Sequence, residues 1–257
     1  VPAAARATSR PRWTAALVTA RHAAALAALR DGQAGAALEL LDDAAGDAAG
    51  DDAVAIRCDA ALAAVATGDR DRAAARLKAI AKLRCPFPAP ADTQAVPILT
   101  AFVDGLNPRR AGKAVDKLAA LARSATGVSR ALAGSALRVV AMSAADQAYR
   151  AGKLAEARKH LATARAVEVR AGADELAYDL AALDLADGKL DAARAGFAKV
   201  AARVPEALIG AGIVADREGD SAKALDLWRQ AEKAGARLGV LDDWIAAKER
   251  IFGGGER

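Results

Sequence analysis

Residues 174–207 read DELAYDLAALDLADGKLDAARAGFAKVAARVPEA, and this segment holds the clearest structural signal in the chain. Two amphipathic runs rich in alanine and leucine flank the tripeptide DGK, whose centre is Gly188. That glycine lies where one helix ends and the chain reverses, a position that favours a residue free to adopt a positive φ. Beyond it, Ala193 and Phe197 are four residues apart and share one helix face. The segment therefore predicts a helix, a tight turn and a second helix.

The same turn pattern occurs four more times along the chain. The other turn glycines are Gly32, Gly68, Gly152 and Gly219. Five residues after each turn glycine comes an alanine, and nine residues after it comes a large apolar residue: Ala37 and Leu41, Ala73 and Leu77, Ala157 and Leu161, Ala193 and Phe197, Ala224 and Trp228. The spacings between successive glycines are 36, 84, 36 and 31 residues, and the gap of 84 leaves room for one more hairpin.

This recurrence resembles the tetratricopeptide repeat (TPR) family over roughly residues 14–234. The best match is residues 174–207, where Gly188, Phe197 and Pro205 fall on positions that the family marks. The chain departs from the family pattern elsewhere, since the large residues expected early in each first helix are mostly alanine and the repeat length varies. The resemblance implies an all-α protein, a right-handed superhelix (α-solenoid) of stacked helix-turn-helix repeats with a C-terminal capping helix.

The repeat register predicts the organisation of the whole chain. We expect a flexible basic arm, a helical repeat domain over 13–252, and a disordered tail. The arm covers 1–12, the hairpins cover about 14–45, 53–84, 93–123, 129–168, 174–204 and 205–235, the cap covers 238–252, and the tail covers 253–257.

The composition agrees with helices and gives no sign of a specialised environment. Hydrophobic residues make up 54% of the chain and aromatic residues 4%, with alanine, the best helix former, dominating. The net charge is +5, yet acidic and basic residues are interspersed as on solvated helix faces. The most apolar early segment, residues 14–29, is short and interrupted by charge, so we expect no membrane span.

Several motifs admit a chemical interpretation, and each has a simpler structural one. Gly210-Ala211-Gly212 fits part of a dinucleotide fingerprint, but the fingerprint needs a preceding strand, and here the register predicts a helix. The acidic residues between Asp42 and Asp52 lack the spacing of a calcium loop, so we expect a solvated loop. His22 and His160 are far apart and have no repeated partner residue. We therefore predict no catalytic residue, no metal site and no cofactor.

The two cysteines leave the redox state open. Cys58 and Cys85 lie near the same end of the second predicted hairpin, where an oxidising compartment would allow them to pair. We expect two free thiols, because disulfides require narrow geometry, and we favour the cytoplasm over the periplasm.

The TPR resemblance implies a function as well as a fold: a non-catalytic scaffold that binds a peptide or helix of a partner protein in a concave groove. Carried across position by position, it gives His22, Arg30, Tyr149, Arg150, Tyr178 and Arg217 as partner-binding residues. Tyr149 and Tyr178 are the expected anchors, because aromatic side chains often dominate binding energy. A small-molecule substrate is not expected. Two alternatives stay open: a regulatory or sensory segment of a larger signalling protein, and nucleic-acid association through the basic arm with Arg109, Arg110 and Lys113.

Overall fold

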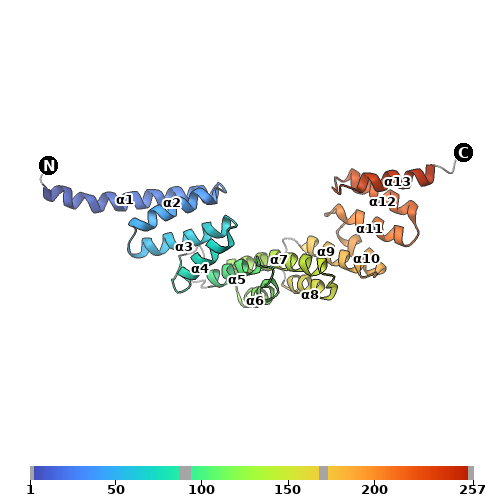
Figure 1. Cartoon of the computed structure of the whole chain (residues 1–257), viewed down its shortest axis with the longest axis horizontal. Helices are drawn as coiled ribbons and strands as arrows, with labels where there is room; N and C mark the ends of the chain where they lie inside the picture. The colour runs from blue at the N-terminus through green and yellow to red at the C-terminus, as the bar shows by residue number, and fades with distance from the viewer. Residues whose placement is uncertain (1–2, 87–93, 168–172, 254–257) are drawn as a thin grey trace. The chain divides into compact units, whose positions relative to one another are not determined.

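The computed structural model describes the backbone of residues 3–86, 94–167 and 173–253, and the side chains of residues 14–86, 94–167 and 173–250. The described residues form thirteen helices and no strand (Figure 1). In chain order the helices are α1 (Ala3–Arg30), α2 (Ala34–Asp47), α3 (Gly50–Ala66), α4 (Arg70–Ile80), α5 (Ala95–Gly105), α6 (Ala111–Ser124), α7 (Gly127–Arg150), α8 (Leu154–Arg165), α9 (Ala173–Ala186), α10 (Leu190–Val200), α11 (Glu206–Arg217), α12 (Ser221–Lys233) and α13 (Leu241–Gly253).

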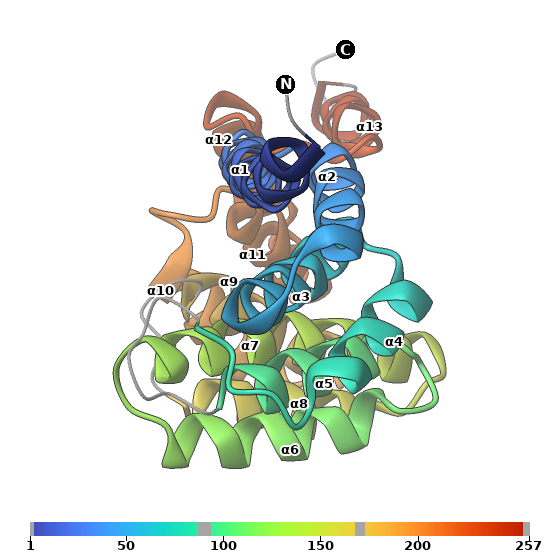
Figure 2. The same ribbon diagram turned by 90° about the vertical axis from the view of Figure 1, so that its left-hand side faces the viewer.

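The chain divides into two compact units, Val1–Val140 and Ala141–Arg257. In the first unit, neighbouring helices from α1 to α6 pack in series, and α1 and α2 lie side by side (Figures 1 and 2). In the second unit, α8 to α13 also pack in series, and α9 additionally contacts α11. The predicted all-α architecture of stacked helical hairpins is confirmed, and the chain is a TPR-like repeat protein in fold.

The predicted turn glycines adopt left-handed backbone conformations. Their φ angles lie between 72° and 86° at Gly32, Gly68, Gly152, Gly188 and Gly219. Four of these turns contain the same type of hydrogen bond. In each, the amide of the residue after the glycine donates to the carbonyl five residues earlier, as Lys189 does to Asp184 at 2.8 Å. The turn at Gly68 differs, because there the amide of Asp69 donates to the Thr67 hydroxyl.

The small and large residues that follow each glycine form the contacts between helices. All five alanines and all five large residues of the predicted pattern are at most 3% exposed. In the first unit, Leu38, Leu41, Ile56 and Leu77 form one core. In the second unit, Phe197 and Trp228 belong to two further core clusters. The positions five and nine residues after each turn glycine are therefore those that face neighbouring helices in every one of these hairpins.

Gly210 and Gly212 have a packing role in α11. A Cβ atom added at Gly210 would lie less than 3.0 Å from ring carbons of Phe197, and one at Gly212 would lie within 3.0 Å of the Trp228 indole. The indole nitrogen of Trp228 donates to the Ile209 carbonyl at 3.3 Å. The two glycines therefore leave room on α11 for aromatic rings from α10 and α12. Because α11 follows another helix in the chain and not a strand, the structure agrees with the helical interpretation of this segment and not with a dinucleotide fingerprint.

The structure differs from the sequence prediction near the N-terminus and in the acidic segment. Helix α1 begins at Ala3, so residues 3–12 are helical where a flexible arm was predicted. Asp42 lies on α2 and forms ion pairs with Arg72 and Arg76 of α4, where a solvated loop was expected. Residues 1–2, 93, 168 and 254–257, which fall within the predicted arm, hairpins and tail, lie outside the described residues.

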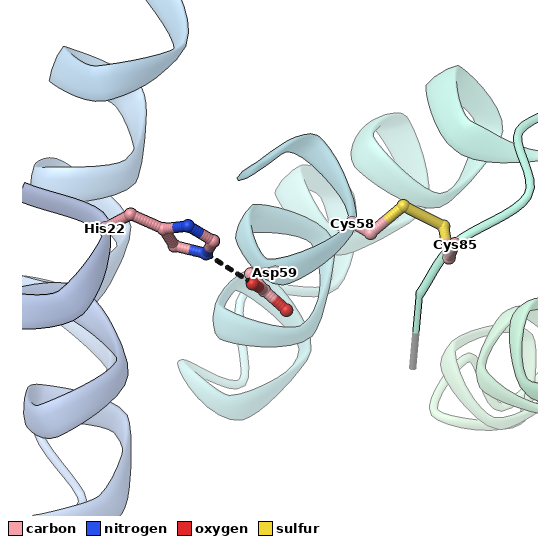
Figure 3. The surroundings of a disulfide bond; sticks show 4 residues. All are labelled: His22, Cys58, Asp59 and Cys85. Atoms are coloured by element: carbon pink, nitrogen blue, oxygen red, sulfur yellow. Dashed lines mark hydrogen bonds and ion pairs between the residues drawn. A yellow bond between two sulfur atoms is a disulfide. The ribbon is translucent and has the colours of Figure 1, made fainter. Parts of the chain in front are cut away.

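The expectation of two free thiols is wrong. Cys58 of α3 and Cys85, which follows α4, form a disulfide with Cα atoms 5.6 Å apart (Figure 3). The Gly68 turn folds α4 back along α3, which brings residues 27 positions apart within the range that a disulfide can span. Cys58 is buried, so the disulfide links the core of the α3–α4 hairpin to the segment that follows α4.

Candidate functional site

The predicted groove residues of the first unit are largely engaged in packing. The His22 ring nitrogen Nε2 lies 2.7 Å from Asp59 Oδ2, which joins α1 to α3 (Figure 3). Arg30 is exposed at the end of α1. Cys58, which precedes Asp59 on α3, is buried and bonded to Cys85. Of these positions, only Arg30 is well exposed to solvent.

Two predicted partner-binding residues of the second unit take part in packing between helices, which their assignment to the groove did not anticipate. The Tyr178 ring packs against Phe197, with centroids 5.7 Å apart, so this partly buried ring covers one side of a core cluster. Burial, followed by the nearby Asp179 and Glu206 carboxylates, raises the pKa of Tyr178. Arg217 Nη1 donates to the Leu185 carbonyl at 2.8 Å and so ties α11 to α9. The register placed these residues on first helices, but contacts between successive hairpins cover part of that face.

The other two residues, Tyr149 and Arg150, lie at the exposed end of α7. The Tyr149 side chain is 50% exposed, which is unusual among the aromatic side chains that the structure describes. Arg150 Nε donates to Asp146 Oδ1 at 3.0 Å, one helical turn earlier, and its side chain is 77% exposed. Tyr149 is therefore accessible from solvent, and its role in partner binding stays a prediction.

A pocket of about 240 Å³ opens beside Tyr149. Helices α7, α8 and α9 form it, so it lies within the second unit. Its apolar part consists of Met142, Ala145, Leu161, Ala182 and Leu183, and its polar part consists of Asp146, Tyr149 and Asp179. The pocket is smaller than the clefts of about 300–1,000 Å³ that hold drug-sized ligands, so its size suits a single side chain.

Asp179 places a partly buried acidic group in the pocket. It is partly buried on α9, and no cationic side chain among the described residues forms an ion pair with it. Burial raises the pKa of Asp179 to about 6, and the like charges of Glu175 and Asp146 act in the same direction. At neutral pH the pocket therefore contains a carboxylate that is partly shielded from water and has no ion-pair partner among the described side chains.

Asp179 and Met142 were missed by the sequence reasoning, although a signal for Asp179 existed. Asp146 and Tyr149 lie three residues apart on α7, the first helix of one hairpin, and Asp179 lies on α9, the first helix of the next. Aligning the first helices of successive repeats would have brought these three residues together. The described side chains contain no cluster of three or more residues able to hold a metal ion.

Described helices include none that is both long and apolar enough to cross a bilayer. No sequence-family model matches the chain, and no curated protein matches it. Among solved structures, it is similar to the P58(IPK) TPR domain, with 15% identity over 93% of this chain and 67% of that chain and a TM-score of 0.42. It is also similar to a thermophilic TPR protein from Thermus thermophilus, TTC0263, with 17% identity over 90% of this chain and 98% of that chain and a TM-score of 0.34. The description of the chain as TPR-like rests on its own hairpins.

Proposed function

We propose that this chain is a non-catalytic scaffold that binds a peptide or helix of a partner protein, with the pocket between α7, α8 and α9 as the anchoring site. The observation that carries the proposal is the exposed ring of Tyr149 at a pocket with an apolar floor. Aromatic side chains next to partly desolvated pockets supply much of the binding energy in protein interfaces. A protruding side chain of the partner fills the pocket, and Tyr149 covers it.

The basic surface considered as a nucleic-acid site receives less support. Arg110 Nη1 lies 2.9 Å from Asp104 Oδ1, so part of its charge is neutralised within the protein. Acidic residues also pair with arginines elsewhere on the surface, as Asp174 does with Arg203. Polyanion binding depends on unpaired cations that replace phosphate counter-ions. The protein-binding function is therefore the one we propose.

The disulfide supports placing this scaffold in an oxidising compartment, in contrast to the cytoplasm favoured from the sequence. Disulfides persist in the periplasm and outside the cell and are rare where glutathione keeps thiols reduced. Mass spectrometry of the protein purified from its native cells under thiol-blocking conditions would test this placement. A linked pair of peptides containing Cys58 and Cys85 is the expected result, and alkylated free thiols would contradict it.

A display experiment tests the proposed function. Peptides that bind the chain are selected from a phage-displayed library of random dodecapeptides, and their affinities are measured by fluorescence anisotropy. Tyr149→Ala is expected to weaken binding of the selected peptides at least tenfold while leaving the helical circular dichroism signal unchanged. Leu238→Ala, at an exposed apolar residue of the same unit outside the pocket, is the matched control. Equal affinities of the Tyr149→Ala variant and the native chain would refute the proposal.

A further inference from the structure

Asp179 forms no ion pair within the part of the chain that the structure describes, and this indicates which kind of ligand would complement the pocket. Its carboxylate is partly withdrawn from water, has other acidic groups as its electrostatic neighbours, and has no cation from the described residues beside it. A desolvated carboxylate is stabilised when an opposite charge comes within about 4–6 Å. The chemically matching occupant is a cation supplied from outside the chain.

The remaining surfaces of the pocket suit a cation at the end of an apolar stem. Met142, Leu161 and Leu183 provide an apolar floor. Lysine and arginine pack their methylene groups along such surfaces and keep the charged head at a polar position. The half-exposed ring of Tyr149 adds a π face that attracts a cation.

Asp146 attracts a cation in the pocket less strongly than Asp179 does, because Arg150 already contacts one of its oxygens. That pair is between neighbouring helical turns and is well exposed, and exposed pairs of this kind are weak. An incoming cation can therefore share Asp146 with Arg150 or displace it. Asp179, in contrast, forms no ion pair with any described side chain that a ligand would have to displace.

We infer that the pocket recognises a basic residue of the partner, a lysine or an arginine, whose stem lies on the apolar floor and whose charge meets Asp179. This inference rests on the proposed function, since it specifies which side chain of the bound peptide fills the anchoring pocket.

The chain carries its own spectroscopic probe for this site. Met142 is the only methionine in the 257 residues and lines the pocket, so methyl-¹³C-methionine labelling places a single native NMR signal there. N-acetyl-arginine amide and N-acetyl-lysine amide are titrated at pH 7.5. Their uncharged counterparts, N-acetyl-citrulline amide and N-acetyl-norleucine amide, are the controls.

The basic compounds are expected to shift the Met142 signal saturably, with at least tenfold higher affinity than the neutral ones. Asp179→Asn is expected to lower the affinity for both basic compounds at least fivefold, and Asp146→Asn by a smaller factor. Circular dichroism and an unchanged signal position for the unbound variants establish that the pocket is intact. Equal shifts with norleucine and lysine derivatives, or unchanged affinity in Asp179→Asn, would overturn the inference.

The peptides selected by display separate failure of this inference from failure of the proposed function. Selected peptides that need Tyr149 and share a lysine or arginine at one position support both. Selected peptides that need Tyr149, contain no shared basic residue and bind Asp179→Asn normally would overturn the basic-residue inference and leave the scaffold function standing. Peptides indifferent to Tyr149 would overturn the scaffold site, whatever the Met142 signal shows.

Discussion

Replacing Gly210 with alanine is expected to have opposite effects on stability depending on whether Phe197 is present. In the native chain the new Cβ would lie less than 3.0 Å from three carbons of the Phe197 ring, so the ring or the helix must move. Overpacking of this kind costs about 1–3 kcal/mol. Alanine in place of glycine inside a helix gains about 1 kcal/mol, which offsets part of that cost. We therefore expect Gly210→Ala to destabilise the native chain by up to about 2 kcal/mol.

The same substitution is expected to stabilise the chain once the ring has gone. Phe197→Ala alone should lower the free energy of unfolding by about 3–5 kcal/mol, because the side chain is 1% exposed. In that background an alanine at position 210 has no ring to meet, so only the helix-propensity gain of about 1 kcal/mol remains. The difference between the two backgrounds, about 1–3 kcal/mol, is the coupling between the two residues.

Urea unfolding followed by circular dichroism at several temperatures would measure this cycle in the four proteins. Gly35→Ala is the matched control, since Gly35 is helical and a Cβ added there meets nothing within 4 Å. That variant should be neutral or more stable by up to about 1 kcal/mol. A Gly210→Ala effect of the same sign and size with and without Phe197 would refute the packing of α11 against α10 described above.

Three further predictions concern the disulfide and two carboxylates. Cys85→Ser should lower the free energy of unfolding by about 3.5 kcal/mol under non-reducing conditions, the loop-closure value for 27 residues, and adding a reductant should destabilise the native chain but not the variant. Lys248 and Ser221 hydrogen-bond Asp216 and lower its pKa below 3.8. The ionised carboxylate therefore stabilises the folded state above that pH, and this stabilisation is lost as the pH falls through the lowered pKa. Asp216→Asn should reduce the thermal unfolding midpoint at pH 7 and have little effect at the acid end of the range. The contribution of Asp179 to stability has the opposite pH dependence, because its pKa is raised from 3.8 to about 6. Its contribution is fully present below about pH 4, where the carboxyl is protonated, and is lost as the pH rises through 6. Asp179→Asn should therefore raise the thermal unfolding midpoint relative to the native chain at pH 7 and not at pH 4.

The parts of the fold that the sequence predicted are those that a local rule determines. A helix that must reverse within one or two residues requires a positive φ, so Gly188 and its equivalents mark the turns without any knowledge of the tertiary structure. The distance from a turn glycine to the residue that faces the neighbouring helix is also local, because it follows from the helical period. Phe197 was found in this way, and so was the helical context of Gly210.

The parts that could not be predicted depend on contacts between successive hairpins. Tyr178 and Asp179 are adjacent in sequence on α9, yet the ring packs against Phe197 and the carboxylate enters the pocket beside α7 and α8. Which of the two side chains packs into the core and which enters the pocket depends on the rotation of one hairpin against the next. The sequence pattern does not specify this rotation to the few degrees required. Pairing of Cys58 with Cys85 has a different origin within a single hairpin, since it depends on how closely α4 returns along α3.

The bridge between Cys58 and Cys85 also determines how the chain responds to force. A molecule pulled from its two ends transmits tension through the sulfur atoms, so the whole of α4 and the Gly68 turn lie outside the path of the load. The 27-residue loop hides about 90 Å of extended chain, at roughly 3.4 Å per residue. In single-molecule stretching the oxidised protein would therefore be shorter at full extension by about that length, and the missing length would appear when a reductant cuts the bond.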